Sequence, residues 1–357
     1  MRWLPTFWLA LALCTAAWGL LWWKLLGAAR AARLRALATR IRLWERTHPP
    51  PSPATLRALR TAAQAARRAL AASAGDRPSP YGRPWVLFVG DPTADLPALL
   101  AAAHPDGPMP SPADGDGDIF WRWWLTDPLA AIEVCPPPLT PAAPQDSLWL
   151  RALHELAVRR PRLPLDGIAL CVSTAALQAD PSVARPIFDV LCRRVQDTVQ
   201  GLRVRMPVYV IVTGLQRLPG YATVRAALPP EALARVLGTR ADTPATGAGS
   251  PALDLLAQPL MLRLQALRLG LLPQMHGASA RADVHAFVEA MQALAPGLAL
   301  LSGQMGDGAD GTDGAGASDR LPWRALCFTA SGPDSAFVSD LFVRWIPEDQ
   351  GLARPQP

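Results

Sequence analysis

The stretch RPWVLFVGDPTADLPALL, from Arg83 to Leu100, predicts a strand, a tight loop and a helix in direct succession. Its apolar run from Trp85 to Val89 stops at Gly90, and a helical pattern begins near Pro97 after a polar turn. A strand that enters a helix through a loop opened by glycine is the layout of a phosphate-binding loop. The stretch therefore predicts the start of a nucleotide-binding α/β domain.

This loop lacks the groups that would bind a phosphate. When G-x-x-x-x-G-K-[ST] is aligned with Gly90 as its first glycine, Asp95 replaces the second glycine. Leu96 replaces the lysine, and Pro97 replaces the residue whose hydroxyl binds Mg²⁺ and whose N–H opens the helix. A carboxylate about 4 Å from a phosphate oxygen repels it by roughly 4 kcal/mol at an effective dielectric constant of about 20. We therefore expect a nucleotide-binding fold without nucleotide chemistry.

No other lysine can supply the missing charge, because Lys24 is the only lysine in the chain. An arginine such as Arg122 or Arg217 could replace it, but not with the usual geometry of a phosphate-binding loop.

Two further nucleotide motifs are also degenerate. In a GTPase-like fold, the next parallel strand ends in an acidic residue and a D-T-A-G-type segment that reaches Mg²⁺ and the attacking water. That position here holds Glu133, Val134, Cys135 and Pro136. The base-reading motif [NT]-K-x-D would follow Val212, where the chain has Thr213, Gly214, Leu215 and Gln216. Its lysine and aspartate are missing, so we expect no cofactor.

The remaining pattern predicts an α/β fold. Apolar strands at 168–173 and 206–213 alternate with helices at 147–158 and 186–200, which implies a parallel sheet covered by helices. The fold expected is a P-loop GTPase-like parallel sheet with a helical extension, preceded by one transmembrane helix and a helical hairpin. The expected segments are a transmembrane anchor (1–24), a juxtamembrane helical hairpin (25–75), a degenerate P-loop GTPase-like domain (83–225), a helical extension (226–300), a flexible Gly/Asp-rich loop (301–320), and a closing strand and helix (321–353).

The N-terminal segment predicts a membrane span. From Trp3 to Trp23 no residue is charged, the length suits a bilayer, and tryptophans lie near both ends. A cleaved signal peptide would have a shorter apolar core and a cleavage site of small residues without a dense basic flank. The basic residues that follow the span are Lys24, Arg30, Arg33, Arg35, Arg40, Arg42 and Arg46. By the positive-inside rule they place the bulk of the chain in the cytoplasm, as a single-pass protein of the bacterial inner membrane.

Apolar residues recur at helical spacing over 34–44 and again over 56–70, and the breaker HPPPSP (48–53) separates them. This pattern predicts the juxtamembrane hairpin. Its arginines either contact anionic lipid head groups or form a solvated face over a packed seam.

Composition and spacing argue against nucleic acid, metal and catalysis. The formal net charge is +6, but no aromatic and basic platform accompanies the arginines. The spacing of Asp114, Asp116 and Asp118 resembles that of a calcium-binding loop. The glycine and the glutamate that such a loop requires are missing, so a calcium site is not expected. His154 and Glu155 begin an H-E-x-x-H pattern that fails at Val158. The five cysteines form no C-x-x-C pair, which suits buried thiols in a reducing compartment. We expect no enzyme activity and no small-molecule substrate.

The order of several motifs resembles the cytoplasmic part of the IcmF/TssM family, the large inner-membrane component of type VI secretion systems. The motifs are PWVLFVGDP (84–92), WWLTDPLAAIE (123–133), RRPRLPLDGIAL (159–170), RMPVYVIVTGLQRLPGY (205–221), RALCFTASG (324–332) and SDLFVRWIPEDQGLA (339–353). Family members commonly carry two initial spans, recognisable GTPase loops and a large periplasmic region. This chain differs in having one span and degenerate loops, and it stops where the cytoplasmic part ends.

The resemblance implies a non-catalytic scaffold that binds other membrane-complex or baseplate proteins of a type VI secretion system. Two alternatives remain open. One is a divergent GTPase or ATPase that uses an arginine in place of the lysine, and the other is a truncated paralogue that regulates a full-length family member.

Overall fold

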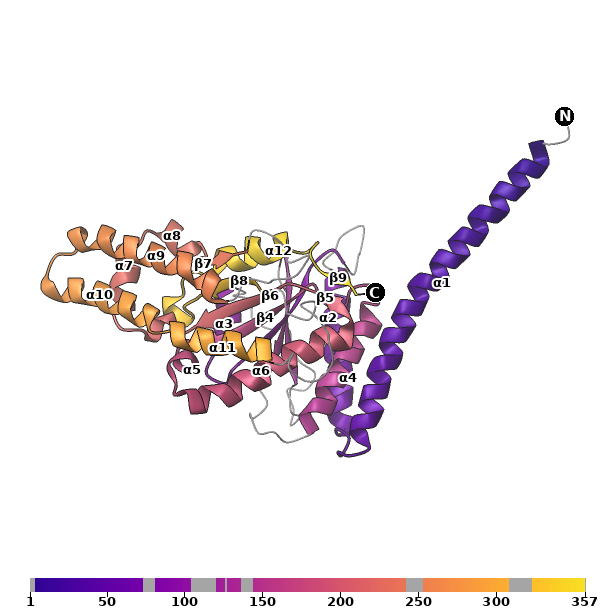
Figure 1. The fold of residues 1–357 in the computed structure, drawn as a ribbon, viewed down its shortest axis with the longest axis horizontal. Coiled ribbons are helices and arrows are strands. Elements are labelled where there is room, and N and C mark those ends of the chain that lie inside the picture. The colour runs from indigo at the N-terminus through magenta and orange to yellow at the C-terminus, as the bar shows by residue number, and fades with distance from the viewer. Residues whose placement is uncertain are drawn as a thin grey trace.

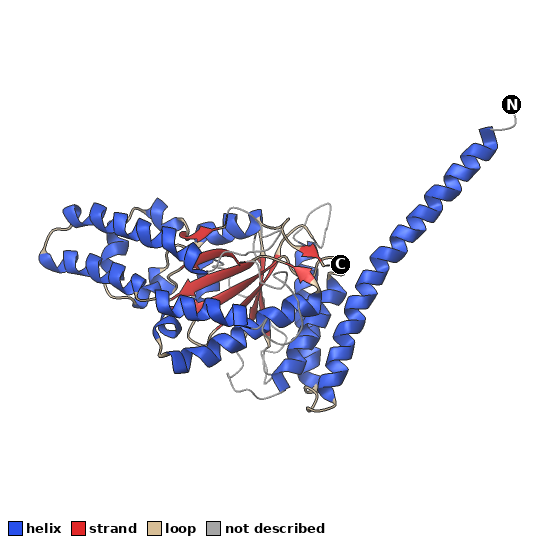
Figure 2. Ribbon diagram, in the orientation of Figure 1, coloured by secondary structure: helices blue, strands red, loops and turns tan. Residues whose placement is uncertain are grey.

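The computed structural model describes residues 4–72, 81–103, 120–125, 127–135, 144–241, 253–307 and 323–356. Its centre is a seven-stranded sheet in the order β2-β3-β1-β4-β6-β8-β7, flanked by helices (Figures 1 and 2). The strands are β1 (Trp85–Gly90), β2 (Trp121–Leu125), β3 (Ala130–Val134), β4 (Gly167–Ser173), β6 (Val208–Thr213), β7 (Leu237–Arg240) and β8 (Trp323–Phe328). A separate two-stranded ribbon pairs β5 (Val204–Arg205) with β9 (Arg354–Pro355).

The five inner strands are parallel, and both edge strands, β2 and β7, run antiparallel to their neighbours. Strand β4 is buried along its whole length, and so is β6. Such continuous apolar strands are typical of parallel sheets covered on both faces. The prediction of an α/β fold with a largely parallel sheet is confirmed.

The two faces of β1 enter different cores, as the two-residue period of a strand requires. Trp85, Leu87 and Val89 lie in the larger core, and Val86 and Phe88 lie in the smaller one. The larger core is covered by α4 (Pro144–Arg159), α6 (Pro181–Leu202), α9 (Leu253–Leu271) and α11 (Ala295–Asp307) among others. The smaller core is covered by α3 (Leu96–Ala103) and by the helical turns Leu341–Trp345 and α12 (Ile346–Glu348).

Short helices connect these layers. They are α5 (Thr174–Gln178), the 3-10 turn η1 (Leu215–Arg217), α7 (Tyr221–Ala227) and α8 (Pro230–Ala234). The longer helix α10 (Ala278–Gln292) packs on α7 and α9. The helical extension expected over 226–300 is not entirely helical, because α8 stops at Ala234 and Leu237 begins edge strand β7. Gly238 permits this pairing, because a Cβ there would lie 2.4 Å from the carbonyl oxygen of Leu326. The helical extension therefore contributes a strand to the sheet.

Two more boundaries differ from the sequence expectation. The loop expected at 301–320 begins later, because α11 continues to Asp307 and buries Leu298 and Leu301 on one side; 308–320 lie outside the described residues. The closing helix expected within 321–353 does not follow β8 directly. Ala336 instead forms a bridge with Ala330, and the helical turns on the sheet begin near Leu341.

The N-terminal helix α1 (Leu4–Glu45) is continuous over 42 residues. At 1.5 Å per residue it is about 63 Å long. Its first half projects away from the domain, and its second half lies against α4 and α6 (Figure 1). The first juxtamembrane helix is thus the direct continuation of the predicted span. The second, α2 (Pro53–Ala72), packs on α4 and β2.

Charged and apolar contacts fix the second half of α1 on the domain. Leu37 is fully buried, and Arg40 forms an ion pair with Asp197 of α6 at 2.6 Å. Glu45 forms a second ion pair with Arg151 of α4, also at 2.6 Å. Because these contacts lie on one continuous helix, the projecting half and the domain are held as a single unit.

Two other segments of the described residues, 255–274 and 278–304, are apolar and long enough to cross a bilayer by length and composition alone. They also bury side chains inside the fold, among them Leu260, Leu264, Val284 and Phe287. Core helices of this kind meet the same criteria, so their apolar character is weak evidence for crossing. The span from Trp3 to Trp23 stays a prediction.

We expect Leu37→Ala to lower the free energy of unfolding by about 2–4 kcal/mol, because it opens a cavity between α1 and α6. A Cβ on Gly201 of α6 would lie 3.2 Å from the Cδ2 atom of Leu37, which shows how closely the two helices approach. Leu43→Ala is the matched control, since Leu43 lies on the same helix and is 63% exposed. Urea unfolding of the full chain in detergent measures both variants, and equal losses would contradict the docking of α1.

Candidate functional site

The loop after β1 lies at the switch point of the sheet. From β1 the chain passes to β2 and β3 on one side of β1, and from β3 it then crosses to β4 on the other side. In open α/β sheets, ligands bind beyond the carboxyl ends of the strands at this point. The three degenerate motifs follow β1, β3 and β6, so the structure brings them to the same edge of the sheet.

Asp91 is the centre of this edge. Its side chain is buried, and Oδ2 accepts a hydrogen bond from the backbone N–H of Ser173 at 2.6 Å. Its other oxygen, Oδ1, accepts from the N–H of Thr93 at 2.8 Å and from the Thr93 hydroxyl at 2.5 Å. The hydroxyls of Thr93 and Ser173 also lie 2.6 Å apart. The polar groups of the loop are therefore bonded to each other.

Leu96 occupies the interior of the loop. Its side chain is buried, and its Cγ atom would lie 3.2 Å from a Cβ placed on Gly90. It packs in the smaller core with Leu99 and Leu100 of the same helix. The residue at the lysine position of the motif therefore serves as a core side chain.

Asp95 caps helix α3. Its φ angle of 50° lies in the left-handed region, which aspartate tolerates better than most residues. Its Oδ1 accepts from the N–H of Ala98 at 3.4 Å, and its carbonyl oxygen accepts from Leu99 at 3.1 Å. A helix N-terminus attracts anions, and here a carboxylate of the chain is already bound there.

The acidic residue of the second motif also has hydrogen-bond partners within the chain. Glu133 is fully buried in β3, where it accepts from the indole N–H of Trp124 at 2.8 Å and from Arg122 at 3.3 Å. Burial raises the pKa of Glu133, and these two donors oppose the rise. Arg122 is therefore bound to Glu133 across the β2–β3 pair.

The other residues of the second motif supply no ligand within the described residues. Val134 is buried in β3, and burial raises the pKa of the Cys135 thiol to about 11, so Cys135 is protonated at neutral pH. Pro136 lies outside the described residues.

The third motif links two loops. Thr213 is buried at the end of β6, and Gly214 turns the chain with a φ angle of 90°. The Gly214 carbonyl accepts from the Thr174 hydroxyl at 3.2 Å. Gln216 exchanges two hydrogen bonds with Ser331 in the loop after β8, at 3.4 and 3.3 Å. The amide that stands near the base-reading position is thus used to hold a neighbouring loop.

One arginine reaches the loop after β1. Arg217 in η1 donates to the carbonyl oxygen of Thr93 at 3.3 Å and is otherwise exposed. Through these contacts the loops after β1, β4, β6 and β8 are joined to one another. Sequence reasoning identified Asp95, Leu96 and Gln216 but missed Thr93, Ser173 and Ser331.

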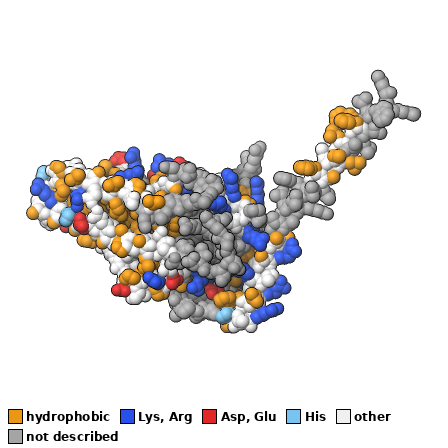
Figure 3. All heavy atoms as spheres, in the orientation of Figure 1, with side chains coloured by type: hydrophobic (Ala, Val, Ile, Leu, Met, Phe, Trp, Pro, Cys, Tyr) orange, Lys and Arg blue, Asp and Glu red, His pale blue; other side chains and the backbone are white. Residues whose placement is uncertain are grey.

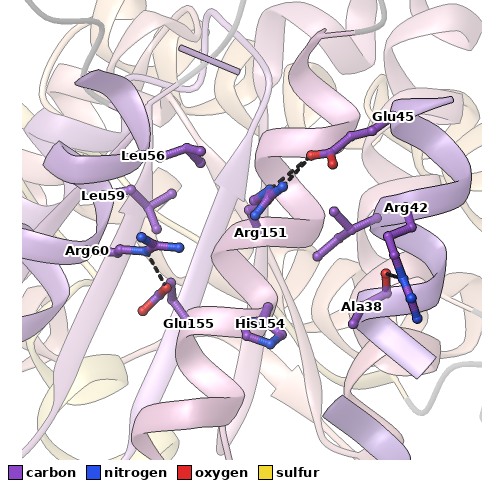
Figure 4. Close-up of a pocket in the computed structure, with 10 residues that line it drawn as sticks. Ala38, Arg42, Glu45, Leu56, Leu59, Arg60, Arg151, His154 and Glu155 are labelled. Carbon is purple, nitrogen blue, oxygen red and sulfur yellow. Dashed lines mark hydrogen bonds and ion pairs between the residues drawn. The ribbon is translucent and has the colours of Figure 1, made fainter. Parts of the chain in front are cut away.

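A separate cavity of about 180 Å³ lies between α1, α2 and α4 (Figure 4). In Figure 4, Arg151 points towards Glu45 and Arg60 points towards Glu155, and the nitrogen and oxygen atoms of each ion pair lie within 2.9 Å of each other. Burial lowers the pKa of His154 between them, and the nearby charges of Arg151 and Arg60 lower it further, against the opposing effect of Glu155. The cavity therefore marks where helices α1 and α2 are fixed to α4.

No group of three His, Cys, Asp or Glu side chains in the described part of the chain is placed to hold a metal ion. His154 and Glu155, the start of the failed zinc pattern, face the cavity between the helices.

Comparison with known proteins indicates the relatives of this chain. Residues 143–309 match the family model of the IcmF-related N-terminal domain. Over 173 residues the chain is 27% identical to the type VI secretion system component TssM1 of Pseudomonas aeruginosa. That alignment covers 46% of this chain and 16% of the relative, so the chain matches only a small part of the relative's length. No solved structure matches the chain.

We expect Asp91→Ala to lower the free energy of unfolding by about 2–3 kcal/mol, because it leaves the buried N–H of Ser173 without an acceptor. Asp95→Asn is the matched control, since Asp95 is exposed and asparagine tolerates a positive φ angle. Thermal and urea unfolding of the full chain measure the difference. A loss no larger for Asp91→Ala than for the control would mean that Asp91 does not hold the loop.

Proposed function

The chain is related to the IcmF/TssM family, and we propose that it is a non-catalytic scaffold of a type VI secretion system in the bacterial inner membrane. Homology to TssM1 indicates a secretion-system component. The observation that carries the non-catalytic role is the closed edge of the sheet, where Asp91 is bonded to Ser173 and Leu96 fills the position of the phosphate-binding lysine. This edge is a degenerate P-loop in a pseudo-GTPase domain.

The strand arrangement supports the pseudo-GTPase proposal. A parallel sheet with its first loop at the switch point is the framework that nucleotide-binding α/β proteins use. In this chain the groups at that point bond to each other rather than remaining available to a ligand. The framework then acts as a rigid body that presents surfaces to partners.

The proposed anchor is the first half of α1. Large apolar side chains are exposed along it, including Phe7, Trp8 and Trp18, which are 60–69% exposed. Orange apolar spheres lie along the visible face of the described part of this projecting helix (Figure 3). A bilayer would bury this surface, and the arginines that follow place the domain in the cytoplasm by the positive-inside rule.

Helix α9 offers a surface for another subunit. Leu255, Leu262 and Leu269 are 57%, 72% and 68% exposed and recur every seven residues. Pro259 and Ala266, which are also exposed, lie between them, so the five residues form one stripe with the spacing of a coiled-coil seam. The partner we propose is an apolar helix of another type VI secretion membrane-complex or baseplate protein.

We expect the full chain, captured from native membranes, to recover other subunits of the secretion system, and Leu262→Glu to reduce that recovery at least tenfold. A charge in the centre of an apolar seam must be desolvated on binding. Val183→Glu is the matched control, because Val183 is 57% exposed on a different helix, α6. Quantitative mass spectrometry of the captured proteins measures both variants. If the unaltered chain recovers no secretion subunit, the proposed scaffold role is contradicted.

The competing proposal is a divergent nucleotide hydrolase, and Arg217 favours it because this exposed side chain already reaches the loop after β1. Arg122, the other candidate, is bound to buried Glu133. A bound nucleotide would require Thr93 and Asp91 to exchange their hydrogen bonds for contacts with phosphate.

We expect millimolar GTP or ATP with Mg²⁺ to leave the unfolding temperature of the full chain unchanged. A ligand present at about one hundred times its dissociation constant would stabilise the folded state by about 2.7 kcal/mol, which such a measurement resolves. Stabilisation by a nucleotide that is lost in Arg217→Gln would favour the hydrolase and contradict the pseudo-GTPase proposal.

A further inference from the structure

The amino edge of the sheet lies where α1 leaves the domain. Arg33 of α1 donates to the carbonyl oxygen of Pro161, just after α4, at 3.0 Å. The neighbouring N–H of Arg162 donates to the hydroxyl of Tyr81, just before β1, at 3.0 Å. The ribbon of β5 and β9 and the C-terminus lie on the same side of the domain, beside α1 (Figure 1). Segments distant in sequence therefore meet at the base of the projecting helix.

This end of the molecule carries exposed arginines from several elements, here called the arginine surface. Its members are Arg30, Arg35, Arg67, Arg68, Arg162, Arg203 and Arg354. They come from α1, α2, the turn after α4, the C-cap position of α6, and β9. Blue basic side chains gather around the base of α1 in the space-filling view (Figure 3).

Carboxylates do not neutralise this surface among the described residues. None of its seven arginines forms an ion pair there, and the nearby acids have other partners. Asp166 is bound to buried Arg160 at 2.6 Å, and Glu155 is bound to Arg60 and Arg159.

The arginines lie close enough to affect neighbouring charges. Burial lowers the pKa of Arg33, and the charge of Arg203 lowers it further. Burial likewise lowers the pKa of Arg159, where the charge of Arg67 adds to the effect. Several like charges held together cost free energy unless an anionic partner compensates them.

The proposed membrane supplies that partner. Arg30 follows Lys24 by six residues, which is about 9 Å along a helix. The potential of an anionic leaflet extends over a screening length of about 8–10 Å in physiological salt. Arg30 lies within this distance of the end of the span, and Arg162 and Arg203 lie beside Arg33, less than one turn further on.

We propose that the arginine surface binds the head groups of anionic phospholipids, so that the amino edge of the sheet rests on the membrane and the carboxyl edge faces away from it. The inference rests on the proposed anchoring by α1. A lipid surface fits better than single-stranded nucleic acid, which needs exposed aromatic rings. The nearest ring, that of Tyr81, is instead stacked on Arg160 at 4.8 Å.

The test uses the full chain in two lipid nanodiscs, one of phosphatidylcholine and one with about a third of phosphatidylglycerol. We expect amide hydrogen exchange of residues 199–206 and 351–356 to slow at least fivefold in the anionic disc. The effect should vanish at about 1 M salt, where the screening length falls to about 3 Å. Residues 229–236 should exchange equally in both discs.

The triple variant Arg67→Gln, Arg162→Gln and Arg354→Gln should lose this slowing, since each arginine near a membrane changes the binding constant by about fivefold. The matched control, Arg235→Gln, Arg263→Gln and Arg281→Gln, removes the same charge from exposed arginines of the helical extension and should retain the slowing.

Equal exchange in the two discs, with the chain still embedded, would overturn the lipid contact without contradicting the anchor. Slowing that is equal in both discs and resistant to salt would also overturn it, in favour of a protein contact. Release of the chain from both discs would overturn the anchor itself and this inference with it.

Discussion

The hydrogen bonds of the Asp91 carboxylate connect the two central strands of the sheet at their carboxyl ends. Asp91 follows β1, and Ser173 ends β4, so the bond from the Ser173 N–H to Asp91 closes the gap between neighbouring parallel strands. That gap is where α/β proteins of this architecture place a ligand. A buried carboxylate that accepts several hydrogen bonds is costly to move, because each donor would lose its partner. The remaining loops can then be joined by weaker contacts, such as those between Gln216 and Ser331.

The hydrogen bonds that join the loops at this edge distinguish the domain from a nucleotide-dependent switch. In a nucleotide-dependent switch, loops reorder when a phosphate and its metal ion are present, and the two states differ by the contacts that the ligand supplies. Here the contacts come from the chain itself, through Thr93, Ser173 and Arg217. Under the proposed scaffold role, these contacts would keep the loops in one arrangement without a ligand. A domain of this kind suits a constant structural role better than a timed one.

The sequence predicted the sheet better than the outer layers. Strands β1, β4 and β6 were predicted within two residues, because their buried apolar runs carry the pattern of a parallel sheet. Edge strand β7 was missed, since Leu237–Arg240 is too short and too polar to differ from the end of a helix. Helix α11 was ended too early, because the glycine-rich composition after Leu301 hides the packing that continues it.

The candidate site shows the same limit. Comparison of the loop with a known motif identified which groups are missing at Leu96, Pro97 and Gln216. It could not identify what replaces them, because Thr93, Ser173 and Ser331 belong to no motif and meet only in the folded chain. One signal was available: Asp91 lies just after one predicted parallel strand and Ser173 is the last residue of another, so their side chains had to lie at the same edge.

The continuous helix α1 gives the two edges of the sheet different surroundings. Its second half is fixed by Leu37, by the Arg40–Asp197 pair and by the Glu45–Arg151 pair, so the domain cannot rotate freely about the point where the helix leaves it. A flexible linker at that point would let any face of the domain approach the bilayer. A docked helix instead selects the face beside which it leaves, and that face carries the amino ends of the strands. In the proposed scaffold, the carboxyl edge and the apolar stripe of α9 would then be the surfaces left for partners.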